Sequence, residues 1–142
     1  MGVLSDLVVA PSGDADRIAR AAVPSQEFGG IDIKGIDTVK LCMLHALVTD
    51  QPYKTLKDQY TPVVSVSDEG PWVFRLPDSC VDALARLDDE ARAAVATRWA
   101  QTKEFQFDRW RTAAVAEALE AISALARRAV ESKQSVFLWM HL

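Results

Sequence analysis

The chain has 142 residues, of which 49% are hydrophobic and 25% are charged, and its net charge is −4 with an isoelectric point near 5.1. This length and composition are typical of one globular domain, residues 1–142, with a core that needs no metal or disulfide. The negative charge argues against nucleic acid or an anionic membrane as a partner, and no apolar run approaches the roughly 18 residues that cross a bilayer. We therefore expect a cytoplasmic protein whose two cysteines, Cys42 and Cys80, are reduced.

The first elements of the chain are expected to be short. Residues 3–10 are rich in branched apolar side chains and end before Pro11, which is typical of a strand. Residues 12–23 place alanine and isoleucine side chains on one face, which predicts a short helix. Residues 31–34 alternate between isoleucine and charged side chains, and this pattern favours a short extended segment.

Two helices are expected next. Residues 37–49 are apolar nearly all round, with Asp37 as the N-cap, and a helix of this kind usually lies in the centre of a core. Pro52 suits the first position of a second helix, because apolar side chains follow it at helical spacing as far as Pro62.

The middle of the chain predicts a β-hairpin. Residues 63–67 and 72–77 both alternate, and the turn-forming sequence DEGP separates them. Trp72, Phe74 and Leu76 share one face of the second strand. We interpret this face as core rather than as a platform for a ligand, because no polar groups converge beside it.

Three helices and a strand complete the prediction. Ser79 and Asp82 have the spacing of a capping box, and the acidic residues 88–90 suit the start of the next helix. The longest helix is expected over 108–132, after a break at FQF. Residues 135–142 are apolar on both faces, which favours a central strand. The fold class is therefore α+β, a single domain with a small mixed or antiparallel sheet of about four short strands, five or six helices and a central C-terminal strand.

Several segments carry a resemblance to a known family. The opening MGVLSDLVVAPSGDADRI resembles its first strand and helix, and LHALVTD at 44–50 resembles its Leu-His-x-Leu-Leu-Thr-Gly helix, although Asp50 stands where the family has glycine. FRLPDSCVDAL and the passage into SVFLWM are similar to its strand-to-helix step and its closing strand. On these segments the chain resembles the YfbM-like family of small bacterial proteins, mostly of unknown function. The resemblance implies an α+β fold and no particular activity.

The sequence offers few side chains for chemistry. His45 and His141 are its two histidines, and it has no motif for a metal, a phosphate-binding loop or a serine-hydrolase elbow. We therefore expect no metal and no cofactor, and we name no catalytic residue. The simplest role of His45 is that of a core side chain with a hydrogen-bond partner. The alternative is a small-molecule or peptide cleft formed by His45, His141 and Trp139 with Asp32 or Asp37.

Three hypotheses for function follow. The leading one is a non-enzymatic protein-interaction domain, of an immunity-like or adaptor kind, whose acidic surface binds a protein partner or its own copy; association with a basic partner would be fast and salt-dependent. The competing one is a small-molecule-binding domain or an enzyme that uses His45 as a general acid or base beside a carboxylate. The third is a homodimer formed through exposed aromatic side chains, with Trp72, Trp110 and Trp139 as candidates. The alternative for these tryptophans is that all three belong to the core.

Overall fold

The computed structural model describes residues 3–142 and contains, within them, a five-stranded sheet, eight α-helices and one 3-10 turn. The strands are β1 (Leu4–Ala10), β2 (Ile31–Asp32), β3 (Val64–Ser65), β4 (Trp72–Arg75) and β5 (Ser135–His141). The helices are α1 (Ala15–Arg20), α2 (Pro24–Glu27), α3 (Thr38–Thr49), α4 (Tyr53–Leu56), the 3-10 turn η1 (Lys57–Gln59), α5 (Asp78–Ala85), α6 (Asp89–Ala100), α7 (Lys103–Phe107) and α8 (Thr112–Ser132). The predicted α+β class is confirmed, with one more strand and more short helices than expected. None of these helices is both long and apolar enough to cross a membrane.

The C-terminal strand β5 lies at the centre of the sheet. The strand order is β2-β1-β5-β4-β3, and all neighbouring strands are antiparallel. β5 pairs with β1 along its whole length, from Ser135 opposite Ala10 to His141 opposite Leu4. Its residues up to Met140 are buried on both faces. The predicted central position of this strand is therefore confirmed.

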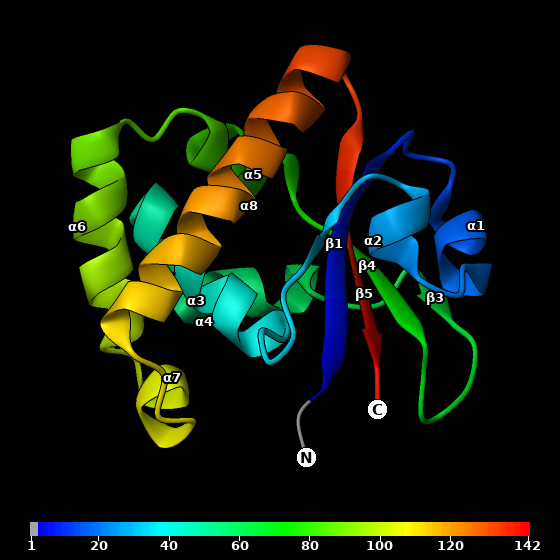
Figure 1. The fold of residues 1–142 in the computed structure, drawn as a ribbon, viewed down its shortest axis with the longest axis horizontal. Coiled ribbons are helices and arrows are strands. Elements are labelled where there is room, and N and C mark those ends of the chain that lie inside the picture. The colour runs from blue at the N-terminus through cyan, green and yellow to red at the C-terminus, as the bar shows by residue number, and fades with distance from the viewer. Residues whose placement is uncertain (1–2) are drawn as a thin grey trace.

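Helices cover the two faces of the sheet unequally. In Figure 1, α3, α5, α6 and α8 lie on one side of the sheet, and the short helices α1 and α2 lie on the other. The first group forms a larger core that includes Leu7 and Leu138 of the sheet. The second forms a smaller core with Val8 and Phe137. Consecutive strand residues point to opposite faces, which explains why these neighbours belong to different cores.

The aromatic strip of the hairpin faces the larger core. Phe74 and Leu76 are buried there and Trp72 is half-buried against it, whereas Val73 lies in the smaller core. The strand partner is β3, in which Val64 lies opposite Val73. The interpretation of this strip as core rather than as a ligand platform is confirmed.

Three helix boundaries differ from the prediction. The second helix expected after α3 ends at Leu56 and continues as a single 3-10 turn. α8 begins only at Thr112, because the FQF sequence is itself helical and belongs to α7. The predicted capping box at Ser79 is wrong, because α5 begins at Asp78 directly after Pro77. Ser79 therefore lies inside the first turn, where its side chain makes a contact with another helix.

Candidate functional site

The structure separates the residues of the predicted histidine cleft. His45 lies on α3, against the larger core, and is fully buried. Trp139 lies in the smaller core on the opposite face of the sheet, and the ring centroid of His141 is 6.0 Å from its own. Asp37 caps α3, and Asp32 at the end of β2 accepts a hydrogen bond from the backbone N–H of Lys34. The predicted common cleft is therefore wrong, because the sheet lies between the two histidines.

Both ring nitrogens of His45 have hydroxyl partners. Nδ1 lies 3.0 Å from the Oη of Tyr60, and Nε2 lies 3.1 Å from the Oγ of Ser79. Burial lowers the pKa of His45, so the ring is neutral near pH 7. Burial also raises the pKa of Cys80 to about 12 and raises that of Cys42, which keeps both thiols protonated. The predicted core position of His45 with a hydrogen-bond partner is confirmed, but its partners are not the carboxylate that we expected for an enzyme.

The tryptophans considered for a dimer face are largely covered. Trp139 is buried in the smaller core, and Trp72 and Trp110 are half-buried against the larger one. The most exposed large hydrophobic side chain over residues 3–142 is instead Phe107 of α7, with an exposed fraction of 87%. Exposed apolar surface is typical of interaction sites, and the surface around Phe107 is therefore a candidate for one.

A hollow of about 340 Å³ lies beside Phe107. Its lining comes from the start of α3 and from α7 with the residue that follows it: Asp37, Lys40, Lys103, Glu104, Phe107 and Asp108. Asp37 is the one residue of the predicted site that lines it. The hollow is thus formed by two segments that lie far apart in the sequence.

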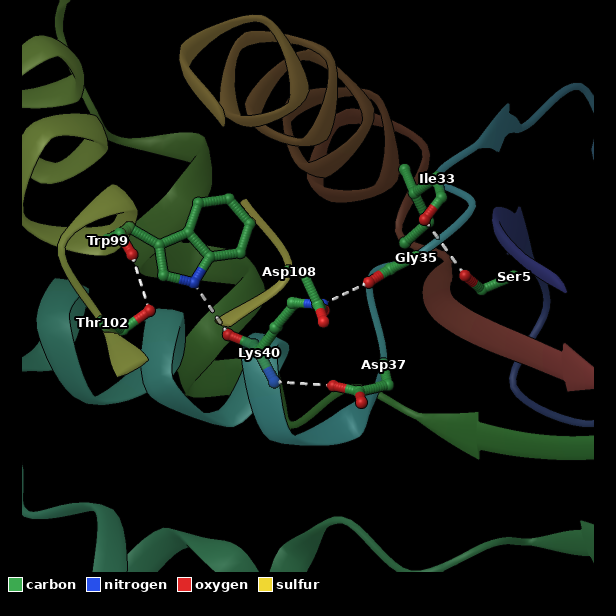
Figure 2. A network of polar contacts seen from close by, with 8 residues as sticks. All are labelled: Ser5, Ile33, Gly35, Asp37, Lys40, Trp99, Thr102 and Asp108. Carbon is green, nitrogen blue, oxygen red and sulfur yellow. Dashed lines mark hydrogen bonds and ion pairs between the residues drawn. The ribbon is translucent and has the colours of Figure 1, made fainter. Parts of the chain in front are cut away.

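Lys40 is the buried residue of this hollow and joins three segments of the chain. Its ammonium group donates a hydrogen bond of 2.6 Å to the carbonyl oxygen of Gly35 and forms an ion pair with Asp108, as Figure 2 shows. The same nitrogen lies 5.3 Å from the ring centroid of Phe105 and 5.9 Å from that of Trp110. The Lys40 side chain is 3% exposed, against 44% for Asp108. A cation buried to this degree requires such partners. The network therefore holds Lys40 in place where it lines the hollow.

Further contacts hold α7 in place. Phe105 is fully buried between Trp99 and Trp110, at centroid distances of 4.8 and 5.0 Å. The indole N–H of Trp99 donates to the carbonyl oxygen of Lys40 at 2.9 Å (Figure 2). Gly35 has a φ of 90°, and a Cβ atom there would lie 3.1 Å from the Trp110 ring, so this position requires glycine. α7 is therefore anchored by its buried side while its other side stays exposed.

The remaining charge of the hollow is acidic. The buried ammonium group and its carboxylate partner cancel, which leaves Asp37 and Glu104 against the exposed Lys103. Burial raises the pKa of Tyr53, and the negative charges of Cys42 in its thiolate form, Glu104 and Asp37 raise it further, in that order. A hollow with this charge favours a cationic group over an anionic one.

Sequence reasoning missed both Phe107 and Lys40. The FQF sequence suggests a break, but it is helical, and Phe105 and Phe107, two positions apart in a helix, point to different sides. Over residues 3–142, no three side chains of the metal-ligating types come together closely enough to hold a metal ion. The resemblance to the YfbM-like family stays a prediction. Comparisons of the chain with family models, curated proteins and solved structures find no match.

Proposed function

We propose that this protein is a protein-interaction domain and that it binds a basic segment of a partner protein at the hollow beside α7. The observation that carries the proposal is the contrast between Phe105, which is fully buried, and Phe107, which is 87% exposed on the same short helix. Exposed aromatic side chains are among the anchors on which protein interfaces concentrate their binding energy.

The chemistry around Phe107 favours an arginine side chain on the partner. Its guanidinium group can stack on the exposed ring, an interaction of about 0.5–1 kcal/mol at an accessible site. Glu104 and Asp37 supply carboxylates beside the ring, and a planar guanidinium group pairs well with a carboxylate. The net charge of −4 attracts a basic partner from a distance, so association is expected to be fast and sensitive to salt.

An NMR titration with two capped dipeptides tests this proposal. Acetyl-Arg-Leu-amide is expected to shift the backbone amide signals of residues 103–110, while the matched peptide with uncharged citrulline is not. Phe107→Ala and Glu104→Gln should each weaken binding by about threefold, since each removes about one exposed contact. Val66→Ala, at another exposed apolar side chain, is the control and should change nothing.

The same titration can refute the proposal. Equal shifts with the citrulline peptide, or shifts scattered away from α7, would contradict it, as would binding that does not weaken when NaCl is raised to about 0.5 M. If the titration supports the proposal, a pull-down from the protein's own cells can identify the natural partner. It is a protein that the wild-type domain retains and the Phe107→Ala domain does not.

A further inference from the structure

A second polar cluster lies on the far side of α3 and connects an exposed serine to a buried imidazole. Ser79 is exposed in the first turn of α5, and its Oγ lies 3.1 Å from Nε2 of the fully buried His45. The other ring nitrogen lies 3.0 Å from the hydroxyl of Tyr60. A nucleophile and a base within hydrogen-bond reach, with the base oriented by a third group, is the arrangement of an activated serine.

An activated serine requires one tautomer of His45. The Tyr60 side chain is 8% exposed, and its hydroxyl oxygen lies 3.0 Å from Nδ1. A phenol oxygen can accept a hydrogen bond as well as donate one, so a protonated Nδ1 can donate to it. Nε2 is then unprotonated and accepts from the hydroxyl of Ser79, which is the tautomer that a general base requires.

The surroundings keep His45 ready to accept a proton. Burial lowers the pKa of His45, so the base form dominates at neutral pH. Ser79 itself stays accessible, because it follows Asp78 and Pro77 at the surface end of α5. The positive end of that helix favours negative charge developing beside Ser79. The N–H groups of Cys80 and Val81 already donate to the carbonyl oxygen of Pro77, so the contribution of the helix is its dipole.

We propose that Ser79 is a nucleophilic serine that takes the acyl group of small activated esters, with His45 as the general base and Tyr60 as a positioning residue. The bond from Ser79 Oγ to the acyl carbon forms while the hydroxyl proton moves to Nε2. The ester C–O bond then breaks, and the proton passes from Nε2 to the leaving oxygen. Water attacks the acyl-serine by the same route and releases the acid. Ser79 does not line the hollow beside α7, so we restrict the proposal to small esters, which can react at an exposed side chain.

The first test uses a fluorophosphonate probe, which forms an Oγ–P bond with an activated serine and loses fluoride. Peptide mapping by mass spectrometry should place the label on Ser79, at a rate at least about 100-fold above that of the exposed Ser12 in the same chain, the lower range of general-base assistance. Ser79→Ala should abolish labelling and the release of p-nitrophenol from p-nitrophenyl acetate. Ser12→Ala is the matched control and should retain both.

A second measurement separates the proposed roles from simple packing. The labelling rate should fall with a midpoint below pH 6.5, the ordinary value for histidine, and Tyr60→Phe should lower the rate and move this midpoint to lower pH. Nitrogen-15 NMR of His45 should show protonated Nδ1 and bare Nε2 in the wild-type chain. Label spread evenly over exposed serines, or a protonated Nε2, would overturn the proposal and leave His45 as a hydrogen-bonded core residue.

Discussion

The ion pair of Lys40 and Asp108 predicts an unequal pair of substitutions. Asp108→Ala leaves the Lys40 side chain in place, 3% exposed, with the Gly35 carbonyl and two aromatic rings as the remaining partners of its ammonium group. Removing one member of a buried pair typically costs about 3–5 kcal/mol, and the lower value applies here because water reaches the pair from the side of Asp108. Lys40→Met keeps the apolar stem and leaves a carboxylate that is already 44% exposed.

The expected loss for Lys40→Met is therefore smaller, about 1 kcal/mol. The lost hydrogen bonds, each about 1.5–3 kcal/mol, are largely offset because a buried ammonium group no longer has to be stripped of water. The double variant with both Lys40→Met and Asp108→Ala should have nearly the same free energy of unfolding as Lys40→Met alone, since neither contains an unpaired buried cation. Urea unfolding followed by far-UV circular dichroism measures all three, with equal m-values as the check on two-state behaviour. If Asp108→Ala costs no more than Lys40→Met, the surface carboxylate does not stabilise the buried lysine and our account of the hollow fails.

Three further predictions concern stability: one is a pH dependence and two are single substitutions. Burial lowers the pKa of His45, so just below pH 6.5 the unfolded chain binds a proton at this residue that the folded chain does not bind. The contribution of His45 to the free energy of unfolding should therefore be constant above pH 6.5 and decrease below it, by up to about 1.4 kcal/mol per pH unit. Urea titrations at several pH values should show this slope, and it should survive His141→Gln. Ser123→Ala should stabilise the fold by up to about 1 kcal/mol in thermal melts, since the buried Ser123 hydroxyl has no hydrogen-bond partner among residues 3–142. Lys133→Gly should also stabilise, by about 1 kcal/mol, because Lys133 ends α8 with a φ of 55°; an unchanged melting temperature would argue that lysine adopts this conformation at no cost.

The elements that depend on local pattern were predictable from the sequence. β1, α3 and β5 each have an apolar pattern that decides their type, and apolar residues on both faces of β5 indicated its central place. The boundaries depended on competition between local signals. Ser79 and Asp82 have capping-box spacing, but the N-cap of α5 is Pro77, two residues earlier, and the Ser79 hydroxyl binds His45 instead.

The candidate sites were not predictable, because they depend on contacts between distant segments. Lys40 and Asp108 are 68 positions apart, and His45 and Ser79 are 34 apart. No periodicity relates such residues, and the helices that bring them together are placed only by packing on the sheet. The expected meeting of His45 with His141 failed for the same reason, since the sequence does not say which face of the sheet each helix covers.

The position of β5 between β1 and β4 has a consequence for the order of folding. β1 and β4 both precede β5 in the chain, and both have apolar faces. The strand with which they both form hydrogen bonds, β5, is synthesised after them. Pairing of β1 with β5 closes a loop that contains nearly the whole chain, and such non-local contacts make folding slow. During synthesis, the edge of β1 that pairs with β5 stays unpaired until residue 135 and those after it leave the ribosome. This waiting period is when the nascent chain is most open to aggregation and to chaperones.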